Sequence, residues 1–317
     1  MTTPPRPLLP EVRSRQGVSE NQRYAMLRLG LGCNVTCPFC NVPWESYDAP
    51  MRLSLTEIKA EIDRIAAEGC ERMHISGGEP TIRPELPDVV AYARAKGMTH
   101  VELQTNGIQL KSQARVARLK EAGLTQAFVG LHSHIPKVHD FLVQSPGAFA
   151  DCVEGVRNLA REGIEVTLNP VLTVVNFRTL TGFIEFIHGS LPGVAQVSLS
   201  VVQPHGRAAR NKSLMPRYGE LSPFVERAVE RAEGLGVLVN NPFCGLPLCV
   251  GGWHKRLVRN VEYCEAEMGR VPGDGEKFHP EPCGSCGLSS HCGGVWKEYP
   301  SIHPVSDLRP IPREAKA

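Results

Sequence analysis

Apolar residues in the first 235 positions follow two alternating patterns. One has the three-to-four-residue spacing of an amphipathic helix, as in Ile58, Ile62 and Ile65, and ends at Gly69. The other consists of short apolar runs, which are typical of buried strands. The helical pattern covers 55–68, 85–96, 112–121, 148–162, 177–187 and 221–234, and the strand pattern covers 24–31, 72–76, 100–104, 126–131, 165–173 and 196–202.

Strand and helix therefore alternate about six times before residue 235. Alternation at this spacing predicts parallel strands joined by right-handed crossovers, in an α/β barrel or an open sheet. Six units fall short of the eight of a closed barrel, and functional side chains are expected at the carboxyl ends of the strands.

The alternation ends after residue 235, and Pro, Gly and Cys dominate from 241 to 294. A segment this poor in apolar residues is expected to fold largely around metal. We therefore predict a mobile N-terminal arm at 1–20, an α/β domain at 21–235, and a small cysteine-rich domain with a C-terminal tail at 236–317.

Composition narrows the class of protein. The chain has 317 residues, 42% of them hydrophobic, and a net charge of +2 without a basic or acidic block. This balance favours neither nucleic acid nor a membrane surface as the main partner. No apolar run approaches the roughly 20 residues of a membrane span. The N-terminus has no apolar signal core, so a cytoplasmic protein is expected.

The chain has eleven cysteines, and without a signal peptide metal binding is favoured over disulfides. Cys70 and Cys152 stand alone in helix-like contexts and are expected to be buried. The other nine form two groups, one of three near the N-terminus and one of six near the C-terminus.

The first group has the spacing Cys33-x3-Cys37-x2-Cys40 and follows the first predicted strand. Thiolates suit iron–sulfur clusters and zinc. A zinc site or a four-cysteine cluster needs a fourth ligand, but the next cysteine, Cys70, lies beyond a predicted helix. Three ligands on a four-iron cluster leave one iron open to bind a small molecule.

This spacing, with Phe39 before the last cysteine, resembles the signature of the radical S-adenosylmethionine (radical SAM) superfamily. Gly77-Gly78-Glu79-Pro80 follows the second strand and resembles the GGE motif of the same superfamily. The alternatives are structural or zinc cysteines and an ordinary strand-to-helix turn.

The resemblance implies a partial (β/α)6 barrel, similar to a TIM barrel and open at one side. It also implies a 4Fe–4S cluster on Cys33, Cys37 and Cys40 whose open iron chelates SAM. SAM is then split into methionine and a 5′-deoxyadenosyl radical. Phe39, Gly77, Gly78 and Glu79 are the expected cofactor-binding residues of these two motifs, with the glycines allowing close approach and the carboxylate receiving the SAM amino group.

Polar residues follow the later strands as well. Gln104 and Asn106 end the third strand, His132 follows the fourth, and Asn169 lies near the end of the fifth. Each could hold SAM or substrate, or be an ordinary loop residue, and the sequence leaves both interpretations open. The same applies to Ser133, His134, Gln203 and His205.

The C-terminal group consists of Cys244, Cys249, Cys264, Cys283, Cys286 and Cys292. It resembles the SPASM and twitch extensions of radical SAM enzymes, which carry auxiliary 4Fe–4S clusters. The chain departs from a full SPASM pattern, because Trp296 stands where a further cysteine is found and no cysteine follows Cys292. Two clusters need eight ligands, so one auxiliary 4Fe–4S cluster is expected.

The resemblance to twitch domains favours Cys244, Cys264, Cys283 and Cys286 as ligands of this cluster, with Cys292 as the chief substitute. A zinc site on the same thiolates is the alternative. Cys249 is then left over. A thiol is a good hydrogen-atom donor to a carbon radical, so Cys249 is either a catalytic donor or a further ligand or buried thiol.

A single-cluster tail with a spare cysteine resembles the aminoglycoside epimerases of the superfamily. This implies inversion of carbon 5 of the terminal aminosugar, converting neomycin C to neomycin B in antibiotic biosynthesis. The 5′-deoxyadenosyl radical would remove one hydrogen and Cys249 would return one, with one SAM consumed per turnover. An electron donor such as flavodoxin or ferredoxin is the expected protein partner.

An aminoglycoside is a polycation and should meet carboxylates, for which Glu45, Asp48 and Glu262 are candidates. The alternative function is a radical SAM maturase or dehydrogenase acting on a ribosomally made peptide. An iron–sulfur scaffold or electron carrier is disfavoured, because such a protein needs no SAM site.

Overall fold

A computed structural model describes residues 23–42, 52–272 and 275–313 of the chain. Its centre is a seven-stranded parallel sheet in the order β1-β2-β3-β4-β5-β7-β9. The strands are β1 (Arg23–Arg28), β2 (Cys70–Ser76), β3 (His100–Thr105), β4 (Gln126–Val129), β5 (Glu165–Leu168), β7 (Val194–Ser198) and β9 (Val239–Asn240). The predicted arm at 1–20 lies outside the described residues.

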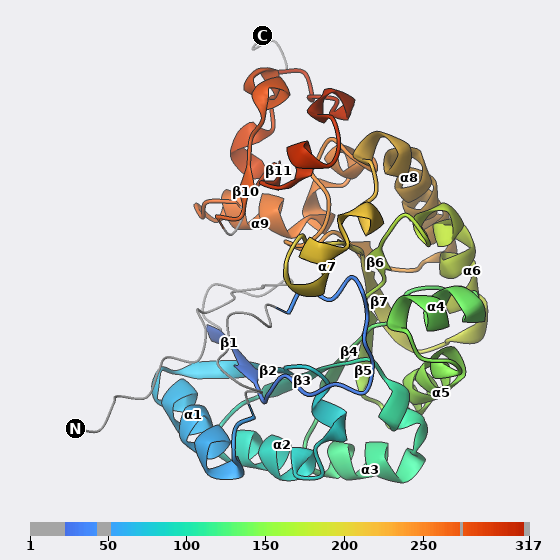
Figure 1. The fold of residues 1–317 in the computed structure, drawn as a ribbon. Coiled ribbons are helices and arrows are strands. Elements are labelled where there is room, and N and C mark those ends of the chain that lie inside the picture. The colour runs from blue at the N-terminus through green and yellow to red at the C-terminus, as the bar shows by residue number, and fades with distance from the viewer. Residues whose placement is uncertain (1–22, 43–51, 273–274, 314–317) are drawn as a thin grey trace.

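Helices connect the consecutive strands and form an outer arc around the sheet (Figure 1). They are α1 (Leu55–Ala67), α2 (Leu86–Ala95), α3 (Gln113–Glu121), α5 (Ala148–Arg161), α6 (Leu180–Ser190) and α8 (Tyr218–Leu235). The six predicted strand–helix units are therefore confirmed. β1 and β9 stand at the two ends of the strand order, so the sheet is a partial barrel that does not close.

Several elements were not predicted from the sequence. α4 (Pro136–Val143) precedes α5, and α7 (Gly206–Arg210) follows β8. The predicted strands at 165–173 and 196–202 are each broken, because β6 (Val171–Leu172) and β8 (Ser200–Val201) pair in a separate small sheet. β9 lies beyond the predicted domain boundary at 235 and still belongs to the main sheet.

Residues 241–272 and 275–313 continue the arc at its upper end in Figure 1. Their regular elements after β9 are short: the helix α9 (Val261–Glu267) and the antiparallel strands β10 (Lys277–Phe278) and β11 (Val295–Trp296). Large aromatic side chains nevertheless pack there, since Trp253, Trp296 and Tyr299 are fully buried. This region shares one hydrophobic core with the barrel.

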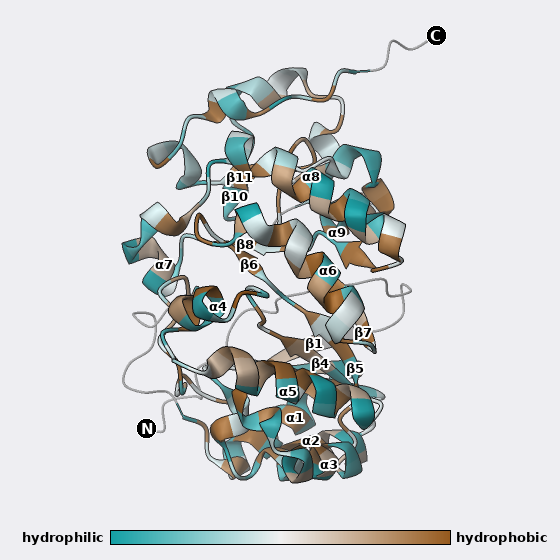
Figure 2. Cartoon of the chain, turned by 90° about the vertical axis from the view of Figure 1, so that its right-hand side faces the viewer, coloured by the Kyte–Doolittle hydropathy of each residue, from teal (hydrophilic) through white to brown (hydrophobic). Residues whose placement is uncertain are grey.

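Alternation along each strand separates two faces of the sheet. Met73 and Ile75 of β2 are 1% and 0% exposed and belong to the core between strands and helices. Ile58, Ile62 and Ile65 of α1 fill the same core. Figure 2 accordingly shows helices such as α5 and α6 with both apolar and polar bands.

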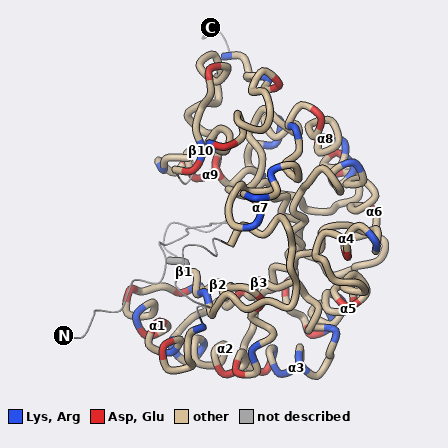
Figure 3. The backbone as a smooth tube through the Cα atoms, in the orientation of Figure 1, with Lys and Arg blue, Asp and Glu red and all other residues tan. Residues whose placement is uncertain are grey.

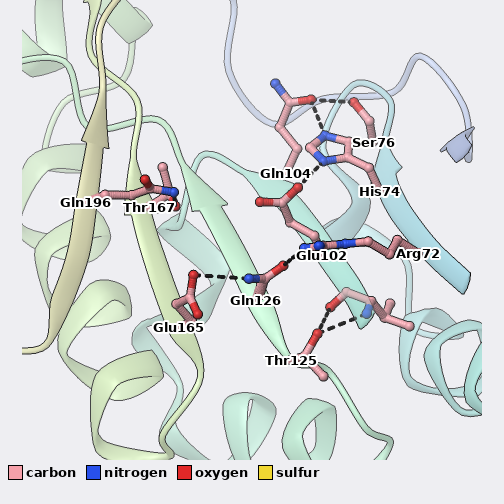
Figure 4. A network of polar contacts seen from close by, with 11 residues as sticks. Arg72, His74, Ser76, Glu102, Gln104, Thr125, Gln126, Glu165, Thr167 and Gln196 are labelled. Carbon is pink, nitrogen blue, oxygen red and sulfur yellow. Dashed lines mark hydrogen bonds and ion pairs between the residues drawn. The ribbon is translucent and has the colours of Figure 1, made fainter. Parts of the chain in front are cut away.

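The opposite face of the sheet carries polar side chains that bond across strands (Figure 4). His74 of β2 lies 2.6 Å from the carboxylate of Glu102 of β3, and Gln104 accepts a hydrogen bond from Ser76 at 2.7 Å. A closed eight-stranded barrel fills this space with apolar side chains. Here the inner face is polar and suits a polar ligand.

Charged residues of both signs are mixed over the outer helices (Figure 3), as the small net charge suggests. No helix among the described residues has the length and apolar character needed to cross a membrane. Cys152 is fully buried in α5 as predicted, whereas Cys70 begins β2 and is half-buried, so its predicted helical setting is wrong.

Candidate active site

The three cysteines of the first motif lie on one loop that follows β1. Cys33, Cys37 and Cys40 are each half-buried, and Cys40 N donates to Cys37 O at 3.2 Å. The end of the loop is hydrogen-bonded to α7, because Ala208 N donates to Cys40 O at 3.2 Å. Gly206 allows this approach, since a Cβ atom there would lie 2.1 Å from Val42 O. Protein contacts therefore fix the shape of the loop.

Burial disfavours the thiolate form of two of the three cysteines, Cys33 and Cys37. Burial, followed by the neighbouring thiols, raises the pKa of Cys37 to about 12. Burial also raises the pKa of Cys33. The positive charge of Arg207 on α7 opposes part of this rise in both pKa values and so favours thiolate, the form that binds metal.

The donor set fits a cluster with three protein-bound irons. All three sulfurs come from one loop. Across 23–42, 52–272 and 275–313, no three Cys, His, Asp or Glu side chains are grouped to hold a single metal ion. Three thiolates from one loop are a ligand set that an iron–sulfur cluster can take.

Phe39 packs under this loop rather than facing out of it. Its ring is 7% exposed and meets the His132 ring edge-on at a centroid distance of 4.8 Å. His132 is itself 8% exposed, and its Nδ1 accepts a hydrogen bond from Val171 N at 3.2 Å. Burial, followed by the nearby His139, holds the pKa of His132 well below its usual value. His132 is thus a neutral, buried support for the loop.

The GGE segment passes directly beneath the start of the cysteine loop. Gly78 N donates to Gly30 O and Glu79 N to Gly32 O, both at 2.8 Å. A Cβ atom on Gly78 would lie 2.1 Å from Gly32 O, and one on Gly77, whose φ is +148°, would lie 2.5 Å from Gly30 O. The glycines were expected to admit a ligand. Here they allow two backbone segments to approach closely, and they also line a cavity together with Gly30 and Gly32.

Glu79 joins the ends of β2 and β3. The carboxylate is 2% exposed. Its Oε1 accepts from Thr81 N, Thr81 Oγ1 and Thr105 Oγ1 at 2.9, 2.6 and 2.7 Å, and its Oε2 accepts from Asn106 N at 2.7 Å. Burial raises its pKa and the hydrogen bonds oppose this. The carboxylate expected to receive the SAM amino group is therefore already bound by four protein donors.

Of the other expected cofactor-binding residues, Asn106 and Gln104 lie where a ligand could reach them, whereas Asn169 is buried. Asn106 Nδ2 donates to Asn34 Oδ1 at 2.7 Å, which links the end of β3 to the cysteine loop. Gln104 is exposed on the inner face of the sheet (Figure 4). Asn169 is instead 7% exposed and donates to Ser198 O at 2.7 Å and to Ser200 Oγ at 2.6 Å. Asn169 therefore fastens β5 to β7 and β8.

A second site lies in the C-terminal region, where four cysteines line one cavity. They are Cys249, Cys283, Cys286 and Cys292, and the remaining walls include Leu248, Leu288, Val295 and Leu308. Burial raises the pKa of Cys249 to about 11 and that of Cys292 to about 12. Four thiols around an apolar cavity fit an iron–sulfur cluster with all four irons held by protein.

The structure divides the six C-terminal cysteines differently from the sequence-based prediction. Cys244 Sγ lies 3.1 Å from Ser200 Oγ, and Val201 N donates to Cys244 O at 2.8 Å, so Cys244 is attached to β8 of the barrel. Cys264 lies on α9, half-buried, and its Sγ faces Val258 O at 3.6 Å. Neither lines the cavity, whereas Cys249 does.

The reason is a tight turn after β9 that the spacing of the cysteines does not reveal. Asn241 Oδ1 accepts from Leu246 N at 2.8 Å, and Asn241 Nδ2 donates to Leu246 O at 2.7 Å. This turn holds Cys244 against the barrel and sends Cys249 toward residues 283–292. Asn34, Ser200 and Asn241 were not singled out from the sequence, since their roles become visible only through the hydrogen bonds they make in the fold.

Residues 27–187, from β1 to α6, match the model of the radical SAM superfamily, and the chain belongs to this superfamily. Fe-coproporphyrin III synthase of Methanosarcina barkeri is 36% identical over 155 residues, which is 49% of this chain and 38% of that protein. PqqA peptide cyclase of Granulibacter bethesdensis is 28% identical over 234 residues, which is 71% of this chain and 62% of that protein. The chain thus spans between 38% and 62% of these relatives.

Solved structures share the fold at low identity. Streptococcus suis SuiB bound to S-adenosylmethionine has a TM-score of 0.57 and 13% identity, over 69% of this chain and 50% of that one. anSMEcpe with AdoMet and the Kp18Cys peptide has a TM-score of 0.55 and 14% identity, over 68% and 63%. As a radical SAM enzyme, the chain uses a 4Fe–4S cluster and SAM as its cofactors.

Proposed function

We propose that this chain is a radical SAM enzyme that oxidises a peptide substrate. The observation that carries the proposal is the four-cysteine cavity, a second cluster site separate from the three-cysteine loop. PqqA peptide cyclase, which matches over 71% of this chain, supports a peptide as substrate. These findings favour the peptide alternative over the resemblance to neomycin C epimerase.

Cys33, Cys37 and Cys40 would hold the SAM-cleaving cluster, and Cys249, Cys283, Cys286 and Cys292 the auxiliary one. When bound, these groups supply a 5′-deoxyadenosyl radical that takes one hydrogen atom from the substrate, and an acceptor for the electron that remains after a proton is lost. The net change is the removal of two hydrogens from the peptide.

The residues of this chain orient and enclose that chemistry. The Glu79 carboxylate would hold the GGE segment to the end of β3, beside the loop whose cluster would bind SAM. Gln104 and Asn106, at the carboxyl end of β3, would contact SAM or the substrate. His132 and Asn169 would support the loop and the sheet from below, because both are buried and bonded within the protein.

The charge around the second site also argues against an aminoglycoside. Glu262, a candidate to meet a polycation, is 2% exposed and paired with Lys277 at 2.6 Å. Its charge is therefore already matched inside the protein. Glu45 and Asp48, the other two candidates, lie outside the described residues.

One observation favours epimerisation as a second candidate function. Cys244 places a thiol at the carboxyl end of the barrel strands, next to Ser200. Its S–H bond could break to give a hydrogen atom to a substrate carbon radical, and the resulting thiyl would regain one electron and one proton from a reductant such as flavodoxin or ferredoxin. The donor would then be Cys244, since Cys249 lines the cluster cavity.

The test compares both substrate classes under the same conditions. The protein is reconstituted anaerobically with iron and sulfide, reduced, and given SAM with either a random peptide mixture or neomycin C in deuterium oxide. Peptides that lose two hydrogens while 5′-deoxyadenosine forms support the proposal. A deuterated epimer of neomycin C with unchanged composition supports the second candidate. Neomycin C consumption with unchanged peptides contradicts the peptide proposal.

A further inference from the structure

A buried ion pair in the C-terminal region contacts two segments of the chain, one next to Cys244 and the other next to Cys292. Lys277 Nζ on β10 lies 2.6 Å from Glu262 Oε1 on α9, and the two side chains are 3% and 2% exposed. The attraction within a buried pair is largely offset by the cost of desolvating both charges. Stability alone is therefore a weak explanation for this pair.

Each charge makes a further contact beside a cysteine. Glu262 Oε2 accepts a hydrogen bond at 2.8 Å from Gly293 N, the residue after Cys292. Lys277 Nζ donates to the carbonyl oxygen of Phe243, the residue before Cys244. The pair thus bridges the segment that lines the four-cysteine cavity and the segment at the mouth of the barrel.

Trp296 shields this bridge from water. It pairs with Lys277 across β10 and β11, and the Lys277 ammonium lies 5.0 Å from the centroid of its ring. Trp296 is 1% exposed, so the charges act through a medium of low dielectric constant, where their effect on neighbours is strongest. Trp296 occupies the position where a full SPASM pattern has a further cysteine, and here it covers the ion pair.

We infer that the Lys277–Glu262 ion pair positions Cys292 and Cys244 and sets the reduction potential of the cluster held at the four-cysteine cavity. The inference rests on the second cluster site of the proposed function. Cluster potentials depend on the net charge nearby and on burial. Reduction adds an electron, so the positive charge of Lys277 favours the reduced cluster and the negative charge of Glu262 disfavours it.

The experiment isolates the second cluster in the full chain. Cys33, Cys37 and Cys40 are replaced by Ala together, so that only the C-terminal cluster is reconstituted. Its potential is followed by electron paramagnetic resonance in K277M, E262Q and the double variant, all at the same pH and ionic strength. K255M is the matched control, because Lys255 pairs with Glu226 at the same 2.6 Å on the surface.

We expect K277M to lower the potential, E262Q to raise it, and the double variant to lie between them, with K255M unchanged. A double variant whose potential returns toward that of the parent excludes general misfolding as the cause of the shifts in the single variants. Single variants that shift in the same direction, or not at all, overturn the inference while leaving the second cluster in place. Failure of the parent to bind any iron overturns the second site itself and with it the proposed function.

Discussion

The Sγ atom of Cys244 lies 3.1 Å from the Oγ atom of Ser200, at the carboxyl end of the barrel strands. Cys249, five positions later, lines a different site together with three other cysteines. One short segment therefore supplies both a thiol beside the barrel mouth and a cysteine of the four-cysteine cavity, and the two cysteines should respond differently to substitution.

Cys244→Ala should leave the iron content of the reconstituted protein unchanged, because Cys244 lies outside the four-cysteine cavity. Iron and sulfide per chain, measured together with 5′-deoxyadenosine formation, check this. Cys264→Ala is the matched control and should behave in the same way. A loss of about four irons in the Cys244 variant would place this residue among the ligands after all.

Gly78→Ala should destabilise the fold by at least about 2 kcal/mol, because overpacking forces the backbone to shift. The new Cβ atom would lie 2.1 Å from Gly32 O, directly before the cysteine loop. Denaturant unfolding and iron uptake by the first site both report the damage. Gly189→Ala on α6 is the control, since nothing lies within 4 Å of its Cβ position. Equal stability of the two variants would contradict the packing argument.

Glu79→Gln should cost about 1–3 kcal/mol of unfolding free energy, since an amide leaves buried donors without an acceptor. The four donors come from Thr81, Thr105 and Asn106. The same variant should bind SAM more weakly, measured by equilibrium dialysis, because the GGE backbone loses its support. Glu121→Gln on the exposed end of α3 should change neither quantity. Unaltered stability in Glu79→Gln would refute the role as a bridge between strands.

The unfolding free energy should fall as the pH drops from about 6.5 to about 4. Burial lowers the pKa of His139 from 6.5 to about 4 in the folded protein. The unfolded chain takes up a proton first, so the stability from His139 is present above pH 6.5 and lost as the pH falls toward 4. The loss is roughly 3 kcal/mol at most. His139→Gln should show a weaker pH dependence in denaturant titrations. An identical pH dependence in the parent and in His139→Gln would exclude His139 as the source of the loss of stability.

The barrel was predictable because its signals are local. Helical periodicity, glycine stops and short strand runs recur along 55–235, and the Cys33 and Gly77 motifs each occupy a few consecutive residues. α4 was missed because its eight residues begin at Pro136 and carry little periodicity. β6, β8 and β9 were not resolved as separate strands because each has only two residues.

The partition of the C-terminal cysteines was not predictable, since it depends on contacts distant in sequence. The attachment of Cys244 to β8 joins positions 44 residues apart, and the spacing Cys244-x4-Cys249 suits either cysteine as a ligand. The role of the glycines was likewise hidden. Gly77 and Gly78 pack on Gly30 and Gly32, and that approach appears only when β1 and β2 are side by side.

The central claim is that Cys249, Cys283, Cys286 and Cys292 hold a second cluster. The most direct test is the iron and sulfide content of Cys249→Ala in a chain whose Cys33, Cys37 and Cys40 are already Ala. The parent should bind about four irons and the Cys249 variant close to none, because a buried four-cysteine site loses one of its ligands. Full iron content in the Cys249 variant, with loss in Cys244→Ala or Cys264→Ala instead, would contradict the account.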